Sequence, residues 1–78
     1  MTEPTAPIRD YAALRRAIDS RRRELGWSML ELDAVTGFCD GYSAKLLGPG
    51  GTRHFGEMSL PTILQALGVE LVLRPAGE

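Results

Sequence analysis

Apolar residues recur at helical spacing in the first third of the chain. Tyr11, Leu14, Ile18 and Leu25 follow one another at steps of three, four and seven residues, which places them on one stripe of a helix. We therefore predict a helix from about Asp10 to Leu25, with this stripe turned toward the core.

Three shorter segments, 29–36, 40–47 and 60–67, also have the pattern of helices. The last of them carries apolar residues at Leu60, Ile63, Leu64 and Leu67. Helix boundaries are predicted from residue types that stabilise helix ends. The expected caps are Asp10, Ser28 with Glu31 as a capping box, Cys39 or Asp40, and Ser59, and the expected stops are Gly26, Gly37 and Gly68.

Residues 69–74 follow a different pattern. Val-Glu-Leu-Val-Leu-Arg is apolar, partly β-branched and partly alternating, and Pro75 follows it, so it predicts one β-strand. The expected fold is mainly α, with four helices and a single C-terminal strand. The chain divides into a flexible arm at 1–9, a helical domain at 10–68, a strand at 69–75 and a tail at 76–78.

Composition limits the class of protein. With 78 residues, 44% hydrophobic and 24% charged, the chain is typical of one small soluble domain. No apolar run reaches the roughly 18 residues of a membrane helix, and Met1 to Ile8 lacks the pattern of a signal peptide. We expect a cytoplasmic protein without membrane contact, and the single cysteine offers neither a disulfide nor a zinc site.

The net charge of −1 hides a basic segment. From Arg9 to Glu24, six arginines stand against three acidic residues, which gives a local charge of +3. His54 has no Ser, Cys or second carboxylate in a recognisable catalytic relation to it. The glycine-rich segment Gly48-Pro49-Gly50-Gly51 lacks the Lys-Ser/Thr of a phosphate-binding loop, so we expect no enzyme and no cofactor. Cys39 has two interpretations, a redox-sensitive thiol at a helix start or a small half-buried turn residue.

Segments 29–36 and 40–47, joined across Gly37 to Asp40, form a candidate helix-turn-helix. The residues that stand around this turn are Leu25-Gly26-Trp27-Ser28, then Leu32 and Gly37, and finally Tyr42-Ser43-Ala44-Lys45-Leu46. Over residues 10–68 the chain resembles the Xre/phage-repressor family of helix-turn-helix DNA-binding proteins. The resemblance implies a lambda-repressor-like domain that binds double-stranded DNA in a sequence-specific manner and regulates transcription, most simply as a repressor.

Four positions depart from the pattern of that family. Met29 stands where Gln is usual, Asp33 where Ala is usual, Ser43 where an aliphatic residue is common and Leu47 where Glu is common. The loop after residue 48 is also longer, and a fifth helix is missing. These departures concern the contacts to DNA more than the fold.

In such a fold the third helix lies in the major groove and presents its N-terminal residues to the bases. The resemblance assigns base readout to Asp40, Gly41, Ala44 and Lys45. Lys45 can donate to guanine, Ala44 can pack on a thymine methyl and Asp40 can accept from cytosine N4, while Gly41 allows close approach. The alternatives are a solvated lysine at position 45 and a simple helix cap at position 40.

The expected phosphate contacts surround that helix. They comprise the hydroxyl and amides at the start of the second helix, one tyrosine hydroxyl and two loop side chains, namely Ser28, Met29, Tyr42, Arg53 and His54. Alternatively, the Tyr42 ring packs on the second helix, and Arg53 and His54 are ordinary loop residues.

Residues 67–74 look like the end of HipB-type antitoxins, in which a C-terminal strand pairs with its copy in a dimer. A single strand needs a partner, because its backbone groups are otherwise unpaired. We predict an intermolecular two-stranded antiparallel sheet centred on Val72, with Glu70 opposite Arg74 of the second copy. The expected interface of this homodimer, which would read a palindromic operator, is Val69, Glu70, Leu71, Val72, Leu73 and Arg74.

Two other functions stay open. The chain could be an antitoxin that binds a toxin as well as its own operator, with apolar surface at Met29, Leu30 and Val35 as the partner site. It could instead be a protein-interaction module without DNA binding, which the missing Gln would favour.

Overall fold

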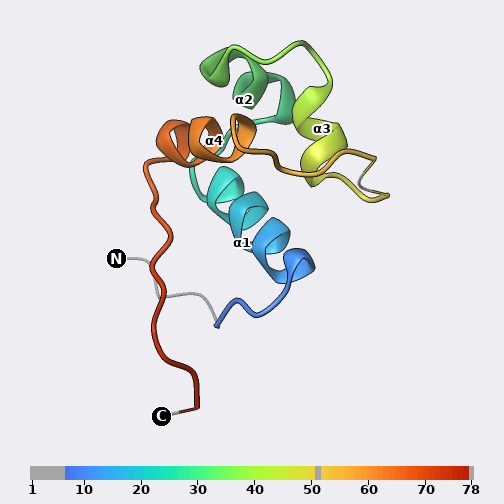
Figure 1. The fold of residues 1–78 in the computed structure, drawn as a ribbon. Coiled ribbons are helices and arrows are strands. Elements are labelled where there is room, and N and C mark those ends of the chain that lie inside the picture. The colour runs from blue at the N-terminus through green and yellow to red at the C-terminus, as the bar shows by residue number, and fades with distance from the viewer. Residues whose placement is uncertain (1–6, 51, 78) are drawn as a thin grey trace.

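Four α-helices form the framework of the computed structural model, which describes residues 7–50 and 52–77 (Figure 1). They are α1 (Tyr11–Glu24), α2 (Met29–Thr36), α3 (Tyr42–Leu47) and α4 (Ser59–Leu67). The mainly helical class is confirmed, and α2 has its predicted bounds. Helix α3 begins at Tyr42 rather than Asp40, so its start was predicted too early.

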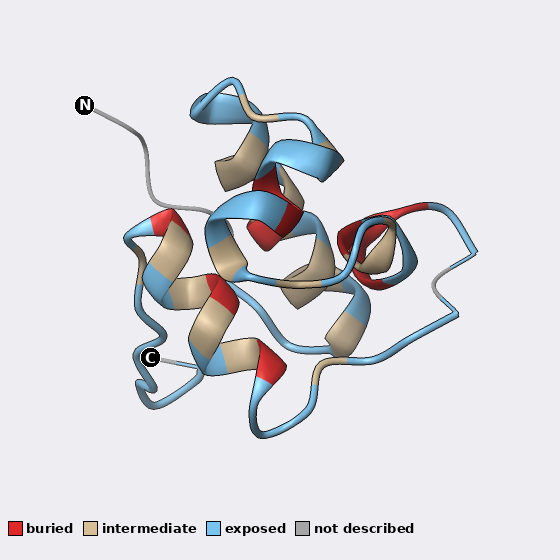
Figure 2. Cartoon of the chain, turned by 90° about the horizontal axis from the view of Figure 1, so that it is seen from above, coloured by how far each residue is buried: buried red, intermediate tan, exposed pale blue. Residues whose placement is uncertain are grey.

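One apolar core joins the four helices. Its most buried side chains come from every helix, namely Ile18, Leu32, Leu46, Leu47, Ile63 and Leu67. Figure 2 shows buried positions on each helix with intermediate ones beside them. Each such side chain stabilises the fold by about 1.5–3 kcal/mol relative to its exposed state. Leu25, expected in the core, is exposed instead, because α1 ends before it and the chain turns at Gly26 in the left-handed region.

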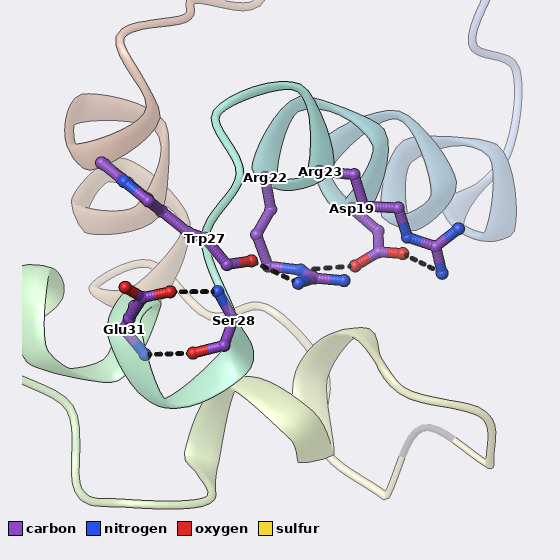
Figure 3. Close-up of polar contacts among 6 residues, drawn as sticks. All are labelled: Asp19, Arg22, Arg23, Trp27, Ser28 and Glu31. Carbon is purple, nitrogen blue, oxygen red and sulfur yellow. Dashed lines mark hydrogen bonds and ion pairs between the residues drawn. The ribbon is translucent and has the colours of Figure 1, made fainter.

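Local signals stabilise the starts of α1 and α2. The Asp10 side chain accepts a hydrogen bond from the Ala13 amide at 2.8 Å. At α2 the predicted capping box is present: the Ser28 hydroxyl accepts from the Glu31 amide at 3.0 Å, and the Glu31 carboxylate accepts from the Ser28 amide at 2.7 Å (Figure 3). Gly37 then ends α2 with φ of 84°, a conformation that glycine adopts without steric cost.

Helix α4 is stabilised partly by contacts from elsewhere. Ser59 is its first residue rather than its predicted cap, and the Ser59 hydroxyl accepts from the Gly56 amide at 2.8 Å. Gly68 ends the helix as predicted. There the Arg21 Nε of α1 donates to the Leu67 carbonyl at 2.9 Å, which supplies a donor to one of the free carbonyls that end a helix.

A charged cluster holds the junction between α1 and α2 (Figure 3). The Asp19 carboxylate pairs with Arg22 at 2.9 Å and with Arg23 at 3.0 Å. Arg22 also donates to the Trp27 carbonyl at 2.6 Å, while the rest of Trp27 packs against the core. The segment that leads into α2 is therefore fixed both through its backbone and through its side chain.

The chain beyond α4 is coil that extends away from the helices (Figure 1). No strand is present within residues 7–50 and 52–77, so the strand predicted at 69–75 is not found. A strand exists only through hydrogen bonds to a neighbouring strand, and no backbone hydrogen bond joins residues 70–75 to another described segment. Leu71 and Val72 are exposed as a result, and Leu73 is 100% exposed.

The predicted N-terminal arm is described only from residue 7 onward, and residues 7–9 are exposed coil before α1. The longest described helix has 14 residues, and no helix in the described ranges combines the length and apolar character needed to span a membrane.

Candidate nucleic-acid interface

One buried carboxylate connects α2 to the start of α3. Asp33, in α2, is 0% exposed. Its Oδ2 accepts a hydrogen bond from the Gly41 amide and its Oδ1 accepts one from the Ser43 amide, each at 2.8 Å. Gly41 has φ of 94°, and α3 has no side-chain cap of its own. Asp33 therefore caps α3 from the neighbouring helix.

The two residues predicted to cap α3 do not do so. Cys39 and Asp40 are both exposed, and the Tyr42 amide donates to the Cys39 carbonyl rather than to a side chain. Of the two interpretations of Asp40, the cap is thus wrong, and its carboxylate faces solvent. Sequence reasoning noted Asp33 only as a departure from a family pattern, because no local motif links an aspartate to amides eight and ten residues later.

Helix α3 has a buried side and an exposed side. The buried side chains are Ser43, Leu46 and Leu47. The exposed side carries three of the residues predicted to read bases, Asp40, Ala44 and Lys45, with the fourth, Gly41, half-buried. Lys45 forms no ion pair with any described residue. Three of the four positions are therefore open to a ligand at α3 and its leading turn, and Gly41 is only partly so.

The start of α2 has some groups that would attract a phosphate and one, the Glu31 carboxylate, that would repel it. Helix geometry leaves the amides of the first turn without intrahelical acceptors, and the predicted Met29 amide is one of them. The capping box, however, engages both the hydroxyl and the amide of Ser28 and places the Glu31 carboxylate at this end. That charge stabilises α2 but repels an anion.

The loop after α3 folds back along that helix. The Arg53 amide donates to the Lys45 carbonyl at 3.2 Å, and the side chains of Arg53 and His54 are exposed. The His54 ring centroid lies 5.0 Å from that of Tyr11, whose hydroxyl accepts from the Phe55 amide at 2.8 Å. Of the two predicted phosphate contacts in this loop, Arg53 thus lies beside α3 and His54 lies beside Tyr11 of α1.

Tyr42 is half-buried at the start of α3. Its ring packs edge-on against Phe38, the turn residue that follows α2, with centroids 5.0 Å apart. The Tyr42 hydroxyl makes no hydrogen bond with a described residue. The ring therefore packs on the turn after α2 rather than on α2 itself, and the phosphate contact of the hydroxyl stays a prediction.

The basic segment of α1 is only partly available to a ligand. Arg21 and Arg22 donate to backbone carbonyls and are half-buried, so they hold the fold together. The Arg23 side chain is 73% exposed although it pairs with Asp19, and Arg16 is also exposed.

Most of the predicted dimer interface is solvent-exposed in a single chain. Val69 is half-buried, and the exposed residues are Glu70, Leu71, Val72, Leu73 and Arg74. Val69, Glu70 and Leu71 all line a groove together with Leu14 of α1 and Leu64 of α4. The first residues after α4 therefore run beside these two helices, although residues 70–74 are exposed.

Comparison with known proteins adds no further constraint on the site. No group of three or more His, Cys, Asp or Glu in the described ranges could hold a metal ion. No family model matches the chain, and no curated protein or solved structure matches it at a significant level. What the chain binds is therefore inferred from the side chains and the geometry described above.

Proposed function

We propose that the chain is a sequence-specific DNA-binding transcriptional regulator, acting as a repressor and built on a lambda-repressor-like helix-turn-helix. One observation carries this proposal. Helix α3 is fixed at its start by Asp33 and exposes Ala44 and Lys45 next to Asp40, while its other side is buried. A helix anchored on one side, with short and basic side chains on the other, fits the major groove of DNA.

In this proposal α3 enters the major groove with its N-terminal end toward the bases. Lys45 donates to O6 and N7 of a guanine, Ala44 contacts a thymine methyl, and Asp40 accepts from cytosine N4. The side chains of the loop after α3 reach phosphates and fix the register of the helix on the duplex.

A single copy of this surface carries little positive charge. Its basic residues, Lys45 and Arg53, are matched by the carboxylates of Asp40 and Glu31. Because phosphate neutralisation supplies a large share of DNA affinity, one domain alone would bind weakly. We therefore propose a homodimer whose two α3 helices lie about 34 Å apart and read a palindrome.

The C-terminal segment is the proposed dimer contact. Antiparallel pairing with the same segment of a second copy would satisfy its backbone groups and form the two-stranded sheet. With the two-fold axis at Val72, Glu70 lies opposite the partner's Arg74. Leu73, fully exposed in one chain, then lies beside the partner's Leu71, which lines the groove between α1 and α4.

Selection from a random duplex library tests the DNA-binding function. We expect the protein to enrich an inverted repeat. Its affinity in fluorescence anisotropy should fall as salt concentration rises, because protein binding releases cations from the DNA and added salt opposes that release. No enrichment, together with an affinity that does not depend on salt, would contradict the proposal.

Sedimentation tests the homodimer and its register. Glu70→Arg or Arg74→Glu alone places like charges opposite each other and should weaken the dimer, whereas E70R/R74E together should restore it. Truncation after Gly68 should give a monomer or an unfolded chain. A register centred on Leu71 would pair Glu70 with Val72, so absence of rescue in the double variant would rule out the Val72 axis.

A protein-interaction module is the second candidate, because α2 exposes two large apolar side chains, Leu30 and Val35. Met29, the third residue of the predicted partner surface, is half-buried and packs against the core, so it is not part of this surface. Leu30 and Val35 would serve a toxin if the chain were an antitoxin. Failure to bind random DNA in a salt-dependent manner would favour the module, and an adjacent toxin gene would favour the antitoxin.

A further inference from the structure

Asp33 holds both ends of the turn between α2 and α3. Its backbone carbonyl accepts from the amides of Gly37 and Phe38 at 2.9 and 3.0 Å, where the turn leaves α2. Its carboxylate accepts from the amides of Gly41 and Ser43 at 2.8 Å, where the turn enters α3. One residue thus connects the whole turn to α2 through four hydrogen bonds.

Helix α3 depends on this connection because it has little stability of its own. It has six residues and begins after a left-handed glycine, which supplies no side-chain cap of its own, and isolated helices of this length are unstable in water. Asp33 is fully buried and has no cation within ion-pair distance among the described residues. The two amides of α3 are therefore the groups that compensate its burial.

We propose that Asp33 is a positioning residue that sets the orientation of α3 against α2, and with it the placement of Lys45 and Ala44. This inference rests on the proposed DNA-binding function. Without the carboxylate, α3 keeps its side chains but loses the bonds that fix its start. Base contacts require defined geometry, whereas phosphate contacts are more tolerant, so specific binding depends on Asp33 more than non-specific binding does.

Three variants separate positioning from general stability. Asp33→Ala removes both side-chain acceptors, and Asp33→Asn keeps the shape and one carbonyl oxygen. Ser43→Ala is the matched control, because Ser43 is equally buried in the same contact but its hydroxyl has no hydrogen-bond partner. S43A keeps the backbone amide that Asp33 binds, so it leaves the connection intact.

Amide hydrogen exchange on the free protein tests the connection itself. The Ile63 amide in α4 reports the loss of global stability in each variant. Relative to that reference, we expect the amides of Gly41 and Ser43 to exchange at least about tenfold faster in D33A than in the wild type. D33N should be intermediate, and S43A should match the wild type at Gly41. Equal acceleration at all three amides would show that Asp33 contributes only global stability, which would overturn the proposal.

Affinity for two duplexes tests the consequence for recognition. The probes are the duplex that the wild type selects from a random library and a scrambled duplex of the same composition, at one salt concentration and a temperature at which each variant is folded. We expect D33A to lose about tenfold or more on the selected duplex and less than about threefold on the scrambled one, with a smaller loss for D33N. Equal losses on both duplexes, or none, would overturn the positioning role.

The two hypotheses fail in distinguishable ways. If the wild type selects no duplex, the proposed function is wrong, and hydrogen exchange still decides whether Asp33 fixes α3. If D33A does not fold, D33N carries both measurements, with S43A as its control.

Discussion

Helices α2 and α3 begin in opposite ways, although only a short turn separates them. The start of α2 is stabilised by its own residues, since Ser28 and Glu31 satisfy each other's amides. The start of α3 is stabilised by Asp33, which belongs to α2. A locally capped helix keeps its start wherever it lies, whereas a helix capped by its neighbour is also oriented by that neighbour. In the proposed DNA complex, the helix that reads bases is the oriented one.

Of the substitutions that test this difference between the two helix starts, Asp33→Ala should have the largest effect on stability. We expect the free energy of unfolding to fall by about 2–4 kcal/mol, because two amides at the start of α3 lose their buried acceptor. Urea denaturation followed by circular dichroism measures the change. An effect no larger than that of removing the cap of α2 would mean that the two helix starts are equivalent.

Lys45→Ala tests whether the oriented helix is the one that reads DNA. Affinity for the selected duplex should fall by about 1–3 kcal/mol, with relaxed preference at one base pair. Stability should hardly change, because the side chain is exposed. Arg16→Ala, which removes the same charge from an exposed site on α1, is the control and should leave base preference unaltered. Unchanged base preference in K45A would exclude α3 as the reading helix.

Ser28→Ala probes the locally capped start. We expect a loss of about 1 kcal/mol in unfolding free energy, a value typical of an N-cap serine. The loss should be smaller than that of D33A, and amide exchange at Gly41 should follow global stability alone. Selective acceleration at Gly41 would show that the start of α3 depends on the cap of α2 as well.

Glu31→Gln should have the smallest effect. Glutamine can complete a capping box, so the fold should persist while the negative charge at the start of α2 disappears. Affinity for random DNA at low salt should rise by about 0.3–1 kcal/mol, the size of a single charge effect at a helix terminus. The gain should vanish at high salt because of screening. A gain that persists there would have another cause.

The sequence predicted those parts of the fold that depend on neighbouring residues. Helix α2 was predicted within its observed bounds because Ser28, Glu31 and Gly37 are local signals. The start of α3 was predicted wrongly because its cap comes from another helix. Leu25 fitted the periodic stripe of α1, but the helix ends one residue before it, and periodicity alone does not show where a helix stops.

In the candidate site too, the features set by neighbouring residues could be predicted and those set by distant segments could not. The exposure of Ala44 and Lys45 follows from helical spacing, since Leu46 and Leu47 occupy the buried side. The loop contacts among Tyr11, His54 and Phe55 could not be predicted, because they join segments more than forty residues apart. The strand predicted at 69–75 illustrates a further reason. An alternating apolar pattern shows that a segment would suit a β-sheet, but it does not show whether a second strand lies beside that segment.

The hydrogen bond from Arg21 to the Leu67 carbonyl bears on the order in which contacts can form while the chain is being synthesised. Its partners are 46 residues apart, and those of the bond between Tyr11 and Phe55 are 44 apart. Both bonds must wait until the ribosome has released most of the domain, because chains are made from the N-terminus onward. The bonds of Asp33 to α3 span only eight and ten residues, and short loops close at lower entropic cost. A ribosome-bound chain can therefore join α2 to α3 while α1 still lacks its final partners.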